Sequence, residues 1–263
     1  MNVAGKRVLL TGATGGLGHA IARRLAAAGA HVVLSGRRGD VLVELAGEIG
    51  GEVAPADLSD AAAVRELATA HADTDILVLN AGLPASGRLE TYSEDQIERA
   101  LLVNLHAPIM LAHAITPHMV QRGSGHVVFM SSLAGKTATA GSSLYNATKF
   151  GLRGFAAALR AELHGTGVGV SSIFPGFIRD AGMFADANVK LPFGVGTKSP
   201  EHVAEATLRA IERDRGEVDV APVGLKLGAL LGGLAPETAA AVTRRSGGAK
   251  VADQFERGQM DKR

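Results

Sequence analysis

The sequence predicts a doubly wound, Rossmann-like α/β fold, a parallel sheet of about seven strands with helices on both faces. Short runs rich in Val, Ile and Leu recur along the chain, and longer Ala-rich helical patterns separate most of them. Buried strands that alternate with helices form right-handed βαβ units, which make the strands parallel. The runs lie at residues 8–10, 32–34, 53–56, 76–79, 127–130, 168–173 and 218–221, and the run at 53–56 is the weakest.

Composition is typical of one soluble domain over residues 1–263, with 46% hydrophobic residues, 20% charged residues and a net charge of +1. No basic stretch is interleaved with aromatic residues, so we expect no nucleic-acid partner. The chain has no Cys, which excludes disulfide and thiolate chemistry, and its histidines lack metal-ligand spacing. With no signal peptide and no apolar run of about 18 residues, we expect no membrane span and a cytoplasmic location.

The first predicted strand leads into a glycine-rich turn at residues 11–18, Thr-Gly-Ala-Thr-Gly-Gly-Leu-Gly. Its glycines allow a sharp turn and a close approach to a ligand, and the N-terminus of the following helix suits a pyrophosphate. A plain turn explains such glycines equally well on their own, but the position between a strand and an Ala-rich helix favours a dinucleotide. The expected cofactor contacts are Gly12, Thr14, Gly15, Gly16, Leu17 and Gly18.

The second and third strands end at residues that bear on cofactor choice. An acidic residue after the second strand would select NAD, whereas this chain has Arg37 and Arg38, which accommodate a 2′-phosphate. We therefore expect NADP(H) in preference to NAD(H); the alternative is two solvated arginines after a turn. After the third strand we expect Asp57 and Leu58 at the cofactor. Asp57 either accepts from the adenine amino group or is a turn residue before an N-cap at Ser59.

The fourth strand ends at Asn80, Ala81 and Gly82, whose small size either lets the backbone line the cofactor cleft or makes a tight turn. A capping box at residues 93–96 starts the next helix, which runs past Asn104. Pro108 cannot donate to the Asn104 carbonyl, so we expect a bend there and a free carbonyl that can hold a water. The alternative is a helix break with Asn104 as a polar core residue.

The fifth strand leads to Ser132, and a helix predicted over residues 145–163 carries Tyr145 and Lys149 on one face. Free tyrosine ionises at about pH 10, and a neighbouring ammonium lowers that pKa toward a range useful for proton transfer. Ser132 can hold a substrate oxygen beside the phenol. Alone, this spacing is explained as well by a surface tyrosine and a solvated lysine.

In combination, these motifs resemble the short-chain dehydrogenase/reductase family over about residues 4–222. The resemblance rests on the glycine turn, Asn80-Ala81-Gly82, Asn104, Ser132 thirteen residues before Tyr145, Tyr145-x-x-x-Lys149 and Pro175-Gly176. It implies an NADP(H)-dependent oxidoreductase of the carbonyl/alcohol branch. In that family's scheme Tyr145 is the general acid/base, Lys149 lowers its pKa and binds the nicotinamide ribose, Ser132 polarises the carbonyl and Asn104 holds a relay water.

The same resemblance places Pro175, Gly176 and Ile178 at the cofactor. Asp180 stands where the family usually has a threonine that bonds the nicotinamide carboxamide. A carboxylate accepts from that amide but cannot donate; alternatively, Asp180 caps the next helix. Residues 183–198 resemble the family's substrate lid, from which we expect Met183 and Phe184 to contact an apolar substrate or to pack on the core.

Residues 224–263 form a C-terminal extension. Its leucine-rich stretch at 225–234 is predicted to pack in the core, rather than to cover the cleft, join subunits or touch a membrane, and its charged end at 253–263 to be solvated. The family resemblance implies a homo-oligomer, dimer or tetramer. Two functions remain open: an oxidoreductase acting on a small-molecule carbonyl or secondary alcohol, and a catalytically silent NADP(H)-binding regulatory or scaffolding protein. A complete Ser-Tyr-Lys-Asn set favours the enzyme.

Overall fold

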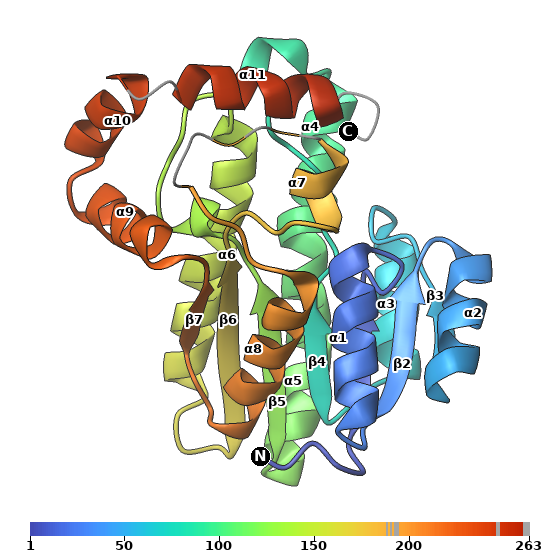
Figure 1. Cartoon of the computed structure of the whole chain (residues 1–263). Coiled ribbons are helices and arrows are strands. Elements are labelled where there is room, and N and C mark those ends of the chain that lie inside the picture. Colours follow the sequence, from blue (N-terminus) through green and yellow to red (C-terminus); the bar gives the residue numbers. More distant parts are fainter. Residues whose placement is uncertain (188, 190, 192–194, 246–247, 260–263) are drawn as a thin grey trace.

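The computed structural model describes residues 1–187, 189, 191, 195–245 and 248–259, and it contains the predicted sheet (Figure 1). All seven predicted strand runs are confirmed, and their neighbours pair in parallel in the order β3-β2-β1-β4-β5-β6-β7. The strand order reverses between β1 and β4, where open α/β sheets bind ligands. The strands are β1 (Arg7–Thr11), β2 (His31–Gly36), β3 (Glu52–Pro55), β4 (Ile76–Leu79), β5 (Gly125–Met130), β6 (Val168–Pro175) and β7 (Glu217–Val220).

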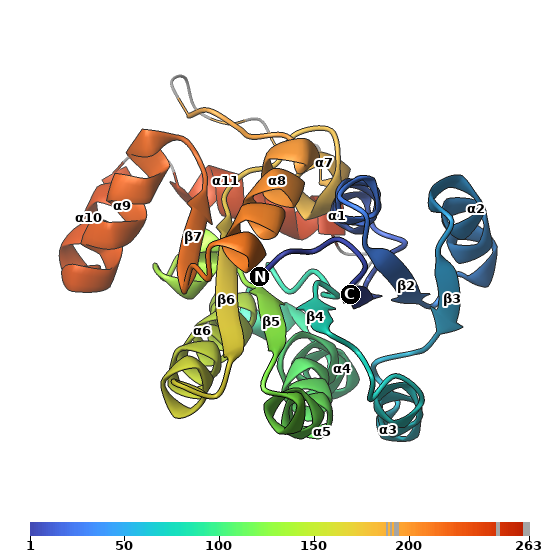
Figure 2. The same ribbon diagram turned by 90° about the horizontal axis from the view of Figure 1, so that it is seen from below.

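Helices cover both faces of the sheet, as Figure 2 shows from below. One layer contains α1 (Gly16–Ala27), α2 (Gly39–Ile49) and α8 (Pro200–Glu212), and the other α3 (Ala61–Ala70), α5 (Ala107–Arg122) and α6 (Ser143–Glu162). Each layer packs its own apolar cluster against the sheet, built around Leu10 and Val128 on one side and Leu9 and Phe129 on the other. Because both faces are buried, the strands read as continuous apolar runs.

Helix α4 (Glu94–Leu101) begins with the predicted capping box: the Ser93 hydroxyl accepts from the Gln96 N–H at 3.3 Å, and the Gln96 side chain accepts from the Ser93 N–H at 3.1 Å. The interruption expected at Asn104 is a π-helical turn, Leu102–His106, that joins α4 to α5 just before Pro108. By length and composition, the resulting helix Glu94–Arg122 could cross a membrane. Its buried residues, Leu111 and Ile115 among them, pack in the core, as in the core helix of a soluble protein.

The rest of the chain lies near the carboxyl edge of the sheet, where α11 (Gly248–Gln259) crosses above the strands (Figure 1). The prediction that the leucine-rich stretch packs in the core is wrong for most of it. It forms α9 (Val223–Leu234), whose helical period leaves Leu227, Leu230, Leu231 and Leu234 between 55% and 76% exposed on one side. The remaining elements are α7 (Gly182–Asp186), α10 (Pro236–Arg245) and 3₁₀ turns at Leu89–Thr91 and Leu133–Gly135.

The prediction of a solvated C-terminal end is also wrong at Phe255 and Gln259, whereas Arg257 is exposed. Phe255 on α11 packs against Phe177 and Phe184, with ring centroids 6.2 and 6.0 Å away. Gln259 is 2% exposed and donates to the carbonyl oxygen of Met183. These contacts attach α11 to the segment that follows β6. Residues 260–263 lie outside the described part of the chain.

Candidate active site

A cavity of about 1640 Å³ opens at the carboxyl edge of the sheet. Pockets for one small ligand measure roughly 300–1,000 Å³, so this one has room for a cofactor and a substrate. It brings together the glycine turn, the ends of β2, β4, β5 and β6, and one face of α6. Of all the predicted catalytic, cofactor and substrate residues, only Asn104 does not line it.

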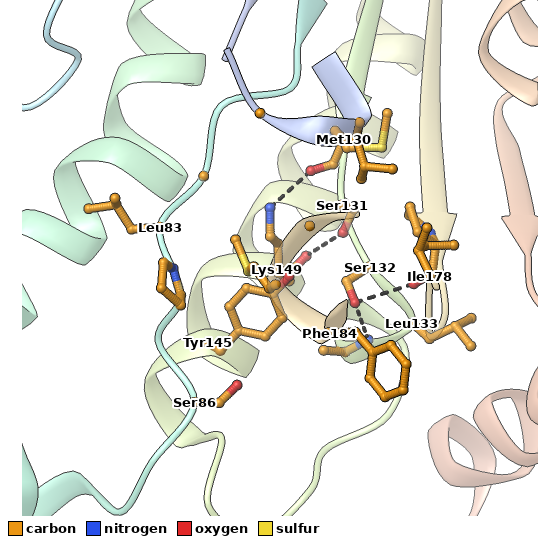
Figure 3. Close-up of a pocket in the computed structure, with 18 of the residues that line it drawn as sticks. Leu83, Ser86, Met130, Ser131, Ser132, Leu133, Tyr145, Lys149, Ile178 and Phe184 are labelled. Carbon is orange, nitrogen blue, oxygen red and sulfur yellow. Dashed lines mark hydrogen bonds between the residues drawn. The ribbon is translucent and has the colours of Figure 1, made fainter. Parts of the chain in front are cut away.

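Tyr145 and Lys149 lie one turn apart on α6 and both line the cavity (Figure 3). The Lys149 ammonium is 5.7 Å from the centroid of the Tyr145 ring. It donates to the carbonyl oxygen of Met130, at the end of β5, over 2.9 Å. Lys149 is buried and Tyr145 is half-buried, so the alternative of a surface tyrosine and a solvated lysine is wrong.

Ser132 follows β5 and its hydroxyl lies beside the phenol. The oxygen accepts from the Ala134 N–H at 3.2 Å and donates a long, 3.4 Å hydrogen bond to the carbonyl of Pro175 (Figure 3). These contacts fix the hydroxyl between β5 and β6, on the side of the cavity that Tyr145 faces. A long bond to a carbonyl is a weak one, so the hydroxyl can exchange it for a substrate oxygen.

Burial dominates the electrostatics of the pair. It raises the pKa of Tyr145 to about 12, with a hydrogen bond from Ser132 acting in the opposite direction. Burial also lowers the pKa of Lys149 to about 8. The expectation that the lysine lowers the tyrosine pKa is therefore wrong for this structure, because loss of solvation disfavours phenolate more than its neighbours stabilise it.

Asn104 lies behind the cavity wall. It is 1% exposed, and its side chain makes two hydrogen bonds to Leu83: the amide donates to the Leu83 carbonyl over 2.9 Å and the oxygen accepts from the Leu83 N–H over 2.6 Å. A Cβ built on Gly82 would lie 3.4 Å from the Asn104 side-chain oxygen and 3.8 Å from the Lys149 ammonium. Asn104 thus anchors the segment after β4 next to the lysine.

The glycine turn is held by hydrogen bonds that sequence reasoning missed. The Asn80 side chain donates to the carbonyl oxygens of Thr11 and Gly12, at 3.1 Å each. The Thr11 hydroxyl accepts from the N–H groups of Asn80 and Ala81. Gly12 has a φ of +65°, and a Cβ there would lie 2.7 Å from the Cα of Ala81, so only glycine fits. Asn80 therefore acts on the turn, and its amide donors are already used.

At the end of β2, Arg37 and Arg38 are exposed and line the cavity. Arg38 also donates to the carbonyl of Thr14 in the glycine turn. Asp57 accepts from the Ser59 N–H and hydroxyl at 3.0 and 2.7 Å. Burial opposes ionisation of Asp57, but these hydrogen bonds and the charges of Arg37 and Arg99 leave its pKa below the ordinary value. The N-cap of α3 is Asp60, not Ser59, because the Asp60 carboxylate accepts from the Ala62 N–H.

Asp180 lines the cavity but does not cap the next helix, because the N-cap of α7 is Ala181. Its φ is +67°, a backbone conformation that favours glycine or asparagine. The carboxylate is 70% exposed and pairs with Arg179 over 3.2 Å. Ala181 in turn packs on Gly16, where a Cβ would collide with its side chain. The segment after β6 is thereby seated on the glycine turn.

Met183 and Phe184 both line the cavity, and Phe184 packs on Phe177 with ring centroids 5.2 Å apart. Leu191 and Val195 line it as well. The predicted lid over residues 183–198 includes residues 188, 190 and 192–194, which lie outside the described part of the chain. Sequence reasoning missed the contribution of α11, which adds Phe255 and Gln259 to the lining, because a charged end gave no apolar pattern to find.

Sequence reasoning also missed Asn146, which directly follows Tyr145. Its amide donates to the carbonyl oxygens of Ala134 and Thr137, at 2.6 and 3.0 Å, and its oxygen accepts from the Thr139 N–H. It thereby fixes the loop that follows Ser132. The signal that could have identified this residue is its position on the helix, because the helical period places Asn146 on the buried face of α6. Within the described residues, no three His, Cys, Asp or Glu side chains are placed to hold a metal ion.

Comparison with known proteins identifies similar chains. A family described as short chain dehydrogenase matches residues 6–191. "Ketoacyl reductase HetN" of Nostoc sp. is 37% identical over 227 residues, which cover 83% of this chain and 79% of the relative. A short-chain dehydrogenase from Sphingobium yanoikuyae, solved in complex with NADPH, is 28% identical with a TM-score of 0.77, covering 89% and 95% of the two chains. A Brucella melitensis 3-ketoacyl-(acyl-carrier-protein) reductase complexed with NADH is 26% identical with a TM-score of 0.74, covering 83% and 97%.

Proposed function

The chain belongs to the short-chain dehydrogenase family, and from this premise we propose that it transfers hydride between NADP(H) and an apolar carbonyl or secondary alcohol substrate. The observation that supports this most is that Tyr145, Lys149 and Ser132 line one cavity together with the glycine turn. A pure nucleotide binder has no need of a tyrosine beside a buried lysine in this cavity. Because members of this family are usually homo-oligomers, we also propose a cytoplasmic dimer or tetramer. Light scattering of the purified protein measures its oligomeric state.

The residues present fit a dinucleotide. The N-cap of α1 is Gly15, which has no side chain to cap the helix, so the N–H groups of the first turn can meet a pyrophosphate. Arg37 and Arg38 offer guanidinium donors at the end of β2, and neither Ser35 nor Gly36 brings a negative charge there. These features support NADP(H) over NAD(H).

In this proposal the reduced nicotinamide supplies the hydride when bound. Tyr145 gives its phenolic proton to the carbonyl oxygen as the alcohol forms, and takes it back in the reverse direction. The Ser132 hydroxyl donates a hydrogen bond to the same oxygen. A phenol with a raised pKa stays protonated at neutral pH, which suits the direction of reduction.

Lys149 would bind the cofactor ribose, and any effect of its charge on the phenol is smaller than the effect of burial, which raises the Tyr145 pKa. The Asn104 side chain is occupied by Leu83, so we propose that it acts mainly by positioning. Its main-chain carbonyl precedes Pro108 by four residues and is the group available to hold a relay water. The water would connect Lys149 to solvent.

Replacement of Tyr145 tests the proposal. Tyr145→Phe should lower kcat for NADPH-dependent reduction of an aldehyde and ketone panel at least about a hundredfold, and leave the Kd for NADPH within about twofold, because it removes only the hydroxyl. Tyr92→Phe, at the only other tyrosine of the chain, is the matched control. Retained activity in Tyr145→Phe would contradict the assigned role. NADPH binding by the natural chain without any turnover would instead favour the silent regulatory or scaffolding protein.

A further inference from the structure

The cavity extends past the predicted cofactor and catalytic residues into an arm between the loop that follows Ser132 and the C-terminal helices. Loop residues 137–140 and residues of α9 and α10 line this part of the cavity, which we call the arm. We propose that the arm binds an extended apolar chain carried by the carbonyl substrate. The inference rests on the proposed oxidoreductase function and adds the class of substrate.

One wall of the arm is apolar from its start beside the catalytic residues. Leu133, which follows Ser132, packs with Ala229 and Leu225 of α9. A Cβ built on Gly176 would lie 3.3 Å from a methyl carbon of Leu133 and 3.6 Å from one of Leu225. Leu225 and Ala229 are one helical turn apart, so the wall continues along α9 for about 6 Å. A chain attached to a carbonyl at Ser132 can therefore follow the helix.

Among the described residues, the far part of the arm has small side chains and no charged one. Gly224 and Gly228 of α9 and Ala239 and Ala240 of α10 line it. Among the described residues of the arm, the polar side chains are the hydroxyls of Thr137, Thr139 and Ser142. Such a wall gives a charged or strongly hydrogen-bonding group few partners, whereas every methylene that enters it leaves water.

The arm is built on fixed contacts. Gly232 of α9 packs on Thr137, where a Cβ would collide with the threonine side chain, and Asn146 holds the Thr137 carbonyl. Lys136 pairs with Asp219 at 2.6 Å and with Glu217 at 3.0 Å, both on β7. These contacts join the loop to α9 and to the sheet, so the arm is formed before a ligand arrives and little ordering opposes binding.

Gly228→Phe tests the proposal without threatening the fold. A Cβ added at Gly228 meets no atom within 4 Å, and replacing glycine inside a helix favours the helix. Leu231→Phe, on the exposed side of the same helix, is the matched control. The first measurement is the Kd of straight-chain methyl ketones, from butanone to decanone, for the NADP⁺-saturated protein, which cannot reduce them.

In the natural chain and in Leu231→Phe, we expect the Kd to fall about fourfold for each methylene that enters the arm. In Gly228→Phe, the ratio of decanone to butanone affinity should fall at least about tenfold. A Kd that does not depend on chain length, or an equal dependence in Gly228→Phe, would overturn the proposal. Ring ketones of equal carbon number that bind as tightly as the chains would also overturn it, in favour of a compact substrate.

Turnover of the same series with NADPH separates this inference from the function it rests on. Chain-length-dependent binding without reduction of any ketone would leave the arm in place and contradict the oxidoreductase. Reduction of butanone and decanone with equal kcat/KM, together with a flat Kd series, would leave the oxidoreductase in place and remove the arm.

Discussion

The ammonium of Lys149 donates to the carbonyl oxygen of Met130 over 2.9 Å, and burial lowers the pKa of that lysine to about 8. One hydrogen bond from a strand end does not replace the water that a charged lysine loses. The ammonium is therefore held in the fold at a cost in stability.

This cost predicts a pH dependence of stability. The pKa of Lys149 is about 8 in the folded chain against an ordinary 10.5, so between these values the unfolded state binds more protons and the free energy of unfolding rises with pH. Relative to Lys149→Met, the natural chain should gain about 2 kcal/mol from pH 8 to about pH 10. Urea unfolding of both proteins measures it. If the free energy of unfolding changed equally with pH in the two proteins, the lysine would keep its ordinary pKa.

The raised pKa of Tyr145 predicts different pH profiles for the two directions of catalysis. Because burial raises the pKa of Tyr145 to about 12, the proton donor for reduction is present throughout the neutral range, while the phenolate needed for oxidation is scarce. We expect kcat/KM for alcohol oxidation to rise between roughly pH 7 and pH 9 while that for reduction stays flat. Ser132→Ala removes a hydrogen bond that favours phenolate, so its oxidation profile should move to higher pH. An unchanged pH profile of oxidation in Ser132→Ala would contradict the hydrogen bond between Ser132 and Tyr145.

How far the sequence predicted this molecule depends on how local each signal is. The strand runs and the capping box at Ser93 are local sequence patterns, and the structure contains all of them. Helix geometry alone was enough to predict that Tyr145 and Lys149 lie side by side. The side-chain partners of Asn80 and Asn104 lie 21 to 69 residues away, and both side chains hydrogen-bond to backbone groups of other segments. No local pattern contains such pairings.

Two other features depended on tertiary packing. The sign of the Tyr145 pKa shift follows from the loss of solvation at the phenol, which no spacing reveals. The leucines of α9 suggested a helix that packs in the core. The helix instead buries its small residues Ala229 and Gly232 and exposes most of its leucines. Close approach of α9 to the loop at Thr137 requires glycine, so the small residues decide which side of the helix faces inward.

The two arginines after β2 predict different effects on cofactor binding. Arg37→Ala should weaken NADPH binding about tenfold or more and leave NADH binding within about twofold, because a charge-assisted bond to the 2′-phosphate is lost. Arg38→Ala should weaken both nucleotides, since Arg38 also holds the Thr14 carbonyl of the glycine turn. Fluorescence titration with each nucleotide measures this. An equal loss of NADH and NADPH affinity in Arg37→Ala would remove the 2′-phosphate argument.

Asn104 should prove to be a positioning residue with a measurable structural effect. Asn104→Ala leaves the N–H and the carbonyl of Leu83 without their side-chain partners inside the fold, so it should lower the free energy of unfolding by about 2–4 kcal/mol. Asn104→Asp keeps the acceptor for the Leu83 N–H but places a carboxylate oxygen against the Leu83 carbonyl in a buried site, so it should cost at least as much. Urea unfolding compares the three proteins. If Asn104→Ala were as stable as the natural chain, the residue would act through the water relay alone.

The exposed side of α9 predicts a contrast between two leucines. Leu111 of α5 is 0% exposed and packs in the core, whereas Leu230 of α9 is 59% exposed. Leu111→Ala should therefore lower the free energy of unfolding by about 2–5 kcal/mol, and Leu230→Ala by less than about 0.5 kcal/mol. Chemical denaturation at two protein concentrations tests both. A large, concentration-dependent loss in Leu230→Ala would mean that a second copy of the chain covers this side of α9, since only an interface makes stability depend on protein concentration.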